Sequence, residues 1–390
     1  MKAYSRWIAP VLFAVVLSTV SRAEEAKPPA SPAPEESEEK LARLFIEVSD
    51  WIAEPGGLTY VPATVNDPSQ TFGTTTLHMP LGDENRARFR VGYLLRGNIG
   101  EFVLTWYSHD QKEELGQYSP GIFVFGEAPV HPAGAGIFDD GMADGILVDT
   151  RTRLRDMRLD FYRIGYQSPR ITVRWFVGYR RVEHNRSLLG TYYSLVPVYN
   201  GVPIPPLIAP LGVPGPLTPI PDVASLESKF NGRGADAGAE LTFPLNRHLY
   251  IESGFSLAVL DGTLQTSYSS LAHVYALANT DGSIDHILSP PFSEFEQTNA
   301  QGTPLIGFIR QLSVPIGIRT DDSASAQVLE SYLGIRWKAW RGLEAFGGYR
   351  NARYTGVGAD VRPNLNTADT TRVDHAAIYQ GFYLGASYKF

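Results

Sequence analysis

The C-terminal stretch 376–390 alternates in hydropathy with a period of two and ends on Phe390. Counting back by twos from Phe390, the residues are apolar except for Gln380. The other parity carries small, polar and aromatic residues such as Ser387 and Tyr383. A period of two places successive side chains on opposite faces of a β-strand. The pattern therefore predicts a final strand with one apolar and one mixed face.

The same alternation recurs along the chain, in windows separated by spacers that are alternately short and long. With 376–390, ten windows alternate: 44–52, 86–96, 99–108, 155–167, 171–183, 228–243, 247–260, 327–339 and 342–354. The short spacers are built of turn-forming residues. The long ones run over about 53–85, 109–154, 184–227, 261–326 and 355–375. Ten strands are expected; twelve is the alternative, if Thr263–Ser269 and Leu305–Ile318 form another hairpin.

The fold class that these features favour is all-β, an antiparallel transmembrane β-barrel. Hydrocarbon cannot satisfy backbone polar groups, so strands that cross it must close on themselves, each crossing taking roughly 9–11 residues. Short turns on one side and long loops on the other are typical of outer-membrane barrels. An even strand count predicts periplasmic termini and long extracellular loops. A soluble β-sandwich, whose strands also alternate, is the alternative.

The N-terminal end has the pattern of an exported protein. Residues 1–23 combine Lys2 and Arg6 with an apolar run and a small-x-small cleavage site, which predicts a signal peptide. Residues 24–40, rich in Pro, Ala and Glu, are expected to be a disordered periplasmic spacer. Residues 41–390 then form the barrel. The chain has no cysteine, and its net charge of −7 argues against a nucleic-acid partner.

Charged residues gather on the parity that is opposite to the apolar face, and this face is expected to point into the lumen. The candidate lumen-lining charges are Arg86, Arg88, Arg90, Glu101, Arg174, Arg180, Glu240, Glu252, Glu330, Arg336, Glu344 and Arg350, with Glu47 and Asp236 beside them. They could cross-link the interior as ion pairs. They could instead line a water-filled passage and set its ion preference. A barrel of ten to twelve strands is narrow enough for either.

Two sequence features resemble known proteins. A last strand that stops on a terminal aromatic resembles the closing strand of bacterial outer-membrane barrels, which implies that Phe390 is an assembly signal read by the barrel-assembly machinery. The stretch from about 155 to 354 resembles the Legionella-type pore-forming major outer-membrane protein family. The matching motifs are Val177-Gly178-Tyr179-Arg180, Phe230-x-Gly232-x-Gly234, Gly254-Phe255-Ser256-Leu257, Leu333-Gly334-Ile335-Arg336-Trp337 and Gly348-Tyr349-Arg350. This resemblance implies an outer-membrane barrel with porin-like activity.

Catalytic and metal-binding motifs are weak in this sequence. The candidate loop residues are His109, Asp110, His131, Asp139, Asp140, Asp144, Asp285 and His286. Adjacent residues of a strand point in opposite directions, and no G-x-S-x-G nucleophile motif accompanies them. The acidic group at 139–144 does not have EF-hand spacing. No enzyme, metal or cofactor is expected.

The expected function is passive passage of small polar solutes or ions through the bacterial outer membrane. The alternatives are a non-conducting structural or ligand-binding barrel that acts through its loops, and an outer-membrane enzyme. The expected partners are outer-membrane lipids, lipopolysaccharide, the assembly machinery and the solutes. The proline-rich segment 197–221 is either a lid over the barrel mouth or a surface loop. Solute identity, ion selectivity, oligomeric state and whether the lumen is open stay unassigned.

Overall fold

A computed structural model gives the fold of the chain from residue 44 to the C-terminus. The described residues are 44–56, 63–67, 73–77, 84–95, 99–118, 124–125, 142–143, 145–199, 202–203, 217–278, 284–287, 309–340, 342–364 and 369–390. The predicted signal peptide, 1–23, and the predicted spacer, 24–40, lie outside them, as does most of the proline-rich segment.

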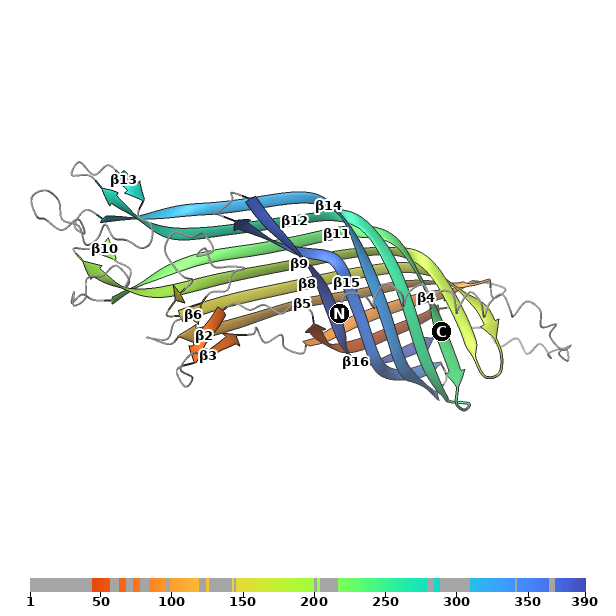
Figure 1. Cartoon of the computed structure of the whole chain (residues 1–390). Helices are drawn as coiled ribbons and strands as arrows, with labels where there is room; N and C mark the ends of the chain where they lie inside the picture. Colours follow the sequence, from red (N-terminus) through yellow and green to blue (C-terminus); the bar gives the residue numbers. More distant parts are fainter. Residues whose placement is uncertain are drawn as a thin grey trace, which may run out of the picture.

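Ten long antiparallel strands form a closed ring (Figure 1). In ring order they are β1 (Leu44–Gly56), β4 (Glu84–Leu94), β5 (Glu101–Tyr118), β8 (Gly145–Gln167), β9 (Thr172–Tyr199), β11 (Leu217–Pro244), β12 (Leu249–Ala278), β14 (Ile309–Trp340), β15 (Leu343–Asn364) and β16 (Asp369–Lys389). Pairing of β1 with β16, from Phe45 opposite Lys389 to Gly56 opposite Ile378, closes the ring. The prediction of a ten-stranded barrel is confirmed.

Six short strands lie outside this ring. β10 (Val202–Pro203) pairs with β9, and β13 (Ile284–Ile287) pairs with β12. The other four form a separate small sheet: β2 (Ala63–Asp67), β3 (Gly73–Leu77), β6 (Val124–Phe125) and β7 (Met142–Ala143). The alternative of twelve ring strands is wrong, because 263–269 continues β12 and 309–318 continues β14, and these two long strands pair with each other along nearly their whole length.

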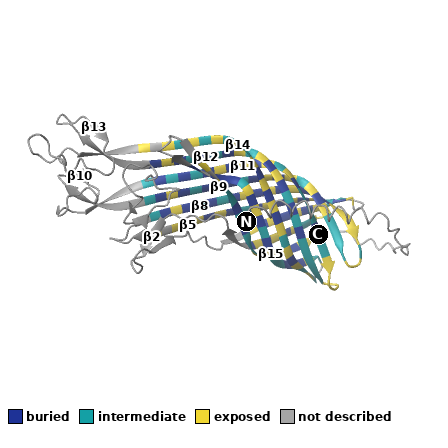
Figure 2. Cartoon of the chain, in the orientation of Figure 1, coloured by how far each residue is buried: buried dark blue, intermediate teal, exposed yellow. Residues whose placement is uncertain are grey.

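The outer face carries a belt of exposed apolar side chains at the short-turn end (Figure 2). Leu159 and Val177 are 50% exposed, Leu333 is 59% and Leu384 is 72% exposed. Water would penalise such a surface, whereas lipid would not. We call this outward-facing zone the belt. On strands around the ring it gives way to polar outward residues, namely Asp50, Ser108, Arg155, Arg181, Arg233, Asp261, Gln327, Asn351 and Gln380. In the described part of the chain, no helix is long and apolar enough to cross a membrane.

Several strands continue far beyond the belt, and this corrects the predicted loops. β12 has 30 residues and β14 has 32, although a crossing needs roughly 9–11. Residues 109–118, 145–154, 184–199, 217–227, 261–278 and 309–326 are strand, not loop. The cause is an inversion of the pattern. Beyond the belt the inward parity carries large apolar residues, as at Leu154, Leu188 and Leu264, among buried polar ones such as Thr152 and Arg186, and the outward parity is mostly polar. The windows predicted from one continuous apolar face therefore end where this pattern changes.

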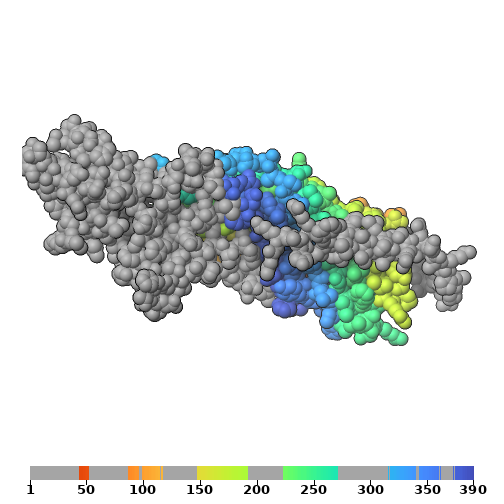
Figure 3. All heavy atoms as spheres, in the orientation of Figure 1, coloured from red at the N-terminus to blue at the C-terminus, as the bar shows by residue number. Residues whose placement is uncertain are grey.

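The start of β1 and the end of β16 both lie at the short-turn end of the barrel. The Phe390 amide donates to the Leu44 carbonyl at 2.9 Å, and the Lys389 amide donates to the Gly342 carbonyl at 3.0 Å. The described residues of β14, β15 and β16 that are visible in the space-filling view are coloured blue (Figure 3). That this end faces the periplasm stays a prediction.

One hairpin leaves the wall and folds inward. Pairing of β14 with β15 ends at Gln327 opposite Thr355, and beyond that point β15 pairs only with β16. Gly356 adopts a φ of 80°, a conformation that favours glycine. Val357 and Ala359 beyond it are fully buried, and the Ala359 amide donates to the Ser228 hydroxyl of β11 at 3.1 Å. We call residues 356–364 and 369–376 the inner hairpin.

Candidate functional site

Charged side chains fill the barrel interior, and the first cluster lies nearest the short turns. Arg336 of β14 contacts three carboxylates, at 2.7 Å to Glu252, 3.0 Å to Glu344 and 3.1 Å to Glu47. Glu47 of β1 also lies 3.8 Å from Arg90 of β4. The cluster therefore joins five strands of the barrel, with every arginine charge opposed by at least one carboxylate.

A second cluster connects β4, β5, β8, β9 and β11 across the lumen. Arg90 lies 3.2 Å from Glu240 and donates to the Tyr162 hydroxyl at 3.1 Å. Arg174 lies 2.5 Å from Glu240 and 3.1 Å from Glu101. Arg90 and Glu240 stand on strands four places apart in the ring, so this ion pair crosses the interior rather than following the wall.

The third cluster, which we call the central cluster, lies deepest and spans the full width of the barrel. It consists of Asp156, Arg158, Arg180, Glu330 and Tyr354. Arg180 pairs with Asp156 and lies 3.3 Å from Glu330, and Arg158 also lies 3.3 Å from Glu330. The Tyr354 hydroxyl donates to Asp156 at 2.7 Å. Those two residues come from β15 and β8, which stand five places apart in the ring of ten and thus face each other directly.

Arg350 of β15 occupies an aromatic cage beside the central cluster. Its guanidinium carbon lies 5.1 Å from the ring centre of Tyr383, 5.3 Å from that of Tyr332 and 5.7 Å from that of Trp51. Glu330 lies 3.6 Å away as its anionic partner. Ring faces attract cations, so the cage holds a buried guanidinium without a second carboxylate.

The space left between these side chains is small. A cavity of about 10 Å³ lies between Trp51, Arg88, Asp156, Glu330 and Arg350. That volume has room for about one water molecule. Between these described side chains of the central cluster and its neighbours, the lumen is therefore closely packed.

The structure places the predicted lumen charges as follows. Buried inside the barrel are Arg88, Arg90, Arg180, Glu240, Glu330, Glu344 and Arg350. Partly buried in the same clusters are Glu101, Arg174, Glu252 and Arg336. Arg86 of β4 lies opposite Trp51 of β1 in the register, and its side chain is outside the described part. Glu47 pairs with Arg90 of β4, whereas Glu101 pairs with Arg174 of β9.

Sequence reasoning missed four members of this interior. Asp156, Arg158 and Asp160 stand on the inward parity of β8, and Tyr354 stands on that of β15. The predicted window 155–167 already contained the first three, so extending the parity rule along that window would have found them. Tyr354 lies at the end of the predicted window 342–354. Its partner Asp156 lies across the lumen, so no local pattern in the sequence indicates their contact.

Of the candidate catalytic residues, the two whose side chains are described, His109 and Asp110, do not form a dyad. His109 and Asp110 lie in β5, not in a loop; His109 is buried inside and Asp110 faces outward. Asp110 pairs with Arg151 at 2.7 Å and with Arg153 at 2.6 Å. Hydrogen bonds from Arg151 and Arg153 hold the pKa of the Asp110 carboxyl well below its usual range. His131, Asp139, Asp140 and Asp144 lie outside the described residues, as do the side chains of Asp285 and His286 in β13.

Above the central cluster, His184 of β9 lies under the inner hairpin. It is 1% exposed, its Nε2 lies 3.4 Å from the Tyr379 hydroxyl, and it has a backbone hydrogen bond with Val357. Burial lowers the pKa of His184 to about 4, although the hydrogen bond with Val357 opposes this shift. The histidine is therefore neutral inside the folded barrel at neutral pH.

Stability is expected to fall as the pH is lowered from about 6.5 to about 4, because the unfolded chain then binds a proton at His184 that the folded barrel does not. The loss should approach roughly 3 kcal/mol and level off below the folded pKa. Urea unfolding in detergent micelles, compared between the wild type and His184→Leu at each pH, measures it. Identical pH profiles for the two proteins would show that His184 does not titrate in this way.

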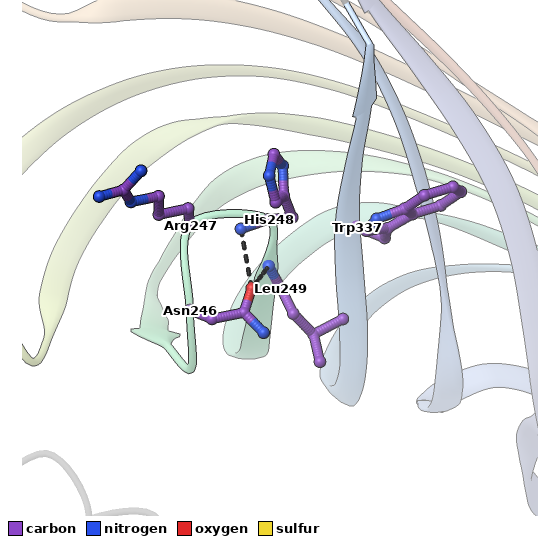
Figure 4. A pocket seen from close by; sticks show the side chains of 5 residues that line it. All are labelled: Asn246, Arg247, His248, Leu249 and Trp337. Atoms are coloured by element: carbon purple, nitrogen blue, oxygen red, sulfur yellow. Dashed lines mark hydrogen bonds between the residues drawn. The ribbon is translucent and has the colours of Figure 1, made fainter.

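A second hollow lies at the short-turn end, outside the lumen (Figure 4). It is lined by Asn246, Arg247, His248, Leu249 and Trp337. The Asn246 side-chain oxygen accepts from the amides of His248 and Leu249 at 2.8 and 2.9 Å, which is an Asx turn. This pattern explains the hollow as turn geometry between β11 and β12.

Comparison with known proteins gives only distant likenesses. No family model matches the chain, and no curated protein matches it. Among solved structures, the outer membrane protease OmpT from Escherichia coli has a TM-score of 0.41 at 8% identity, covering 93% of this chain and 99% of that one. The Pseudomonas putida toluene transporter TodX has a TM-score of 0.30 at 10% identity, covering 92% and 90%. A Pseudomonas aeruginosa FadL homologue has a TM-score of 0.24 at 9% identity, covering 89% and 90%. Likenesses this distant say nothing of activity, and the resemblance to the Legionella-type family stays a prediction.

Proposed function

We propose that this protein is an integral barrel of the bacterial outer membrane whose membrane part is a closed support, and that it acts through the wall beyond the belt. The observation that carries the proposal is the contact between Tyr354 and Asp156, which joins facing strands through the centre of the lumen. A passage for hydrated solutes cannot coexist with a hydrogen bond at that position.

The distribution of charge supports the same conclusion. Rings of one sign of charge favour passage of the opposite ion. In the central cluster, Arg158 and Arg180 are instead compensated by Asp156 and Glu330 at hydrogen-bonding distance. Such compensated pairs leave little net charge to select a passing ion, and removing one partner of a pair would be costly.

The length of the strands supports a role for the outer part. β9 and β11 have 28 residues each, and well over half of each strand lies beyond what a crossing needs. An assembly that only sealed a membrane would not need this wall. For the protein to be a porin, the side chains of the central cluster would have to move apart. For it to be an enzyme, the outer wall would have to carry catalytic groups.

Refolded protein in a planar bilayer is expected to give no single-channel steps, because the central cluster closes the lumen. A variant with residues 357–374 replaced by a short glycine-serine linker should be equally silent, since the ion-pair clusters lie below the inner hairpin. An open porin in the same bilayer is the positive control. Conductance steps from folded wild-type protein, with an ion selectivity that shifts in Arg90→Ser, would instead establish the porin prediction.

A further inference from the structure

Three exposed arginines stand side by side on the outer wall, in the first rows beyond the belt. They are Arg155 of β8, Arg181 of β9 and Arg233 of β11, and we call them the arginine triad. Arg181 and Arg233 are directly opposite each other in the strand register. Arg155 is one row farther out on the neighbouring strand, opposite Glu183. All three side chains therefore reach the same patch of the outer surface.

The triad carries more positive charge than its neighbours compensate. Glu183 lies 2.6 Å from Arg181 and 3.7 Å from Arg155, so one carboxylate serves two arginines. Arg233 stands opposite Asp261 in the register, but within the described residues the two form no ion pair. Like charges directly opposite on a sheet destabilise it unless an anion lies between them. An external anion would relieve the repulsion between Arg181 and Arg233.

The surface directly below the triad is apolar. Met157 of β8, opposite Arg181 in the register, is 41% exposed, and Tyr179 of β9 is 43% exposed. The belt continues below them through Leu159 and Val177. Acyl chains that cover this belt would bring their headgroups to the height of the triad.

The patch is confined to one side of the barrel. On β14, β15 and β16, the outward residues Gln327, Asn351 and Gln380 carry no charge, and the next exposed arginine, Arg353, stands opposite the apolar residues Leu329 and Ile378 rather than beside a second arginine. A uniform ring of cations would indicate a general preference for an anionic membrane surface. A cationic patch on one wall indicates a localised binding site.

We propose that the arginine triad binds the phosphate of a phosphorylated lipid headgroup in the leaflet that surrounds this end of the belt, with the acyl chains against Met157 and Tyr179. Guanidinium groups donate in a fork that matches phosphate oxygens. Lipid A, whose sugar headgroup carries phosphates and whose acyl chains enter the leaflet, has the required chemistry. The inference does not depend on whether the lumen conducts, since every group that it uses lies on the outer face.

The test is lipid binding by the purified full chain in detergent micelles, with native mass spectrometry to count bound lipid A. The triple variant Arg155→Gln, Arg181→Gln, Arg233→Gln removes the patch. The matched control is Arg319→Gln, Arg353→Gln, Arg372→Gln, which removes three exposed arginines from β14, β15 and β16. Each variant is first shown to be folded by its heat-modifiable migration.

The triad variant is expected to lose affinity for lipid A by on the order of tenfold or more, and the control variant by less than about twofold. Lipid A stripped of its phosphates should bind the wild type as weakly as lipid A binds the triad variant. Inorganic phosphate at equal concentration should not displace the lipid, because it lacks the acyl chains. Equal losses in both triple variants, or full displacement by inorganic phosphate, would overturn the proposal.

Discussion

Arg180→Ala is expected to lower the free energy of unfolding by roughly 3–5 kcal/mol, the largest effect of any single arginine substitution that we anticipate. Arg180 is 1% exposed and pairs with Asp156 and Glu330 while lying under Tyr354. Its removal leaves buried carboxylates without their main compensating cation. Reversible urea unfolding in detergent micelles, followed by tryptophan fluorescence, measures the loss.

The matched control is Arg319→Ala. Arg319 is 70% exposed and has a single ion pair, at 3.8 Å from Asp321. An exposed pair of this kind contributes about 0–1 kcal/mol, so the unfolding midpoint should hardly move. If Arg180→Ala and Arg319→Ala were equally mild, the central cluster would not be what stabilises the barrel interior.

Val357→Asp is expected to release the inner hairpin from the lumen. Val357 is fully buried against the interior wall, and a carboxylate placed there would be buried without a partner to compensate its charge. Because the chain has no cysteine, Ala359→Cys provides one unique thiol at a buried position. In the Ala359→Cys protein, a water-soluble maleimide should modify this thiol slowly. In the Val357→Asp background the modification should be faster by on the order of a hundredfold, which corresponds to a loss of about 3 kcal/mol in the free energy that holds the hairpin in place.

Arg353→Asp, an exposed position on the same strand, is the control for the added charge. It should leave the labelling rate of Cys at position 359 unchanged, since its side chain points away from the lumen. Fast labelling in the Ala359→Cys protein itself would contradict the inward packing of the hairpin on β11. If the protein gave no conductance steps although the thiol was labelled fast, the ion-pair clusters alone would close the lumen.

The amino-acid sequence by itself determined the ten crossings and the face of each strand that meets lipid. Both follow from a local rule, because lipid selects apolar side chains on every second residue, as at Phe382 and Leu384. The same rule identified Arg180, Glu240 and Glu330 as inward residues before any contact was known. Beyond the belt water lies outside and packed side chains lie inside, so the rule no longer applies and predicts loops where the chain forms strands.

Only the tertiary structure decided which charges meet and where the chain leaves the wall. Tyr354 and Asp156 are separated by 198 residues and stand on facing strands, and their contact depends on ring order and register rather than on any local pattern. The inward turn at Gly356 depends likewise on the end of pairing between β14 and β15. The meeting of these side chains in the interior is thus a property of the whole ring, and no single strand encodes it.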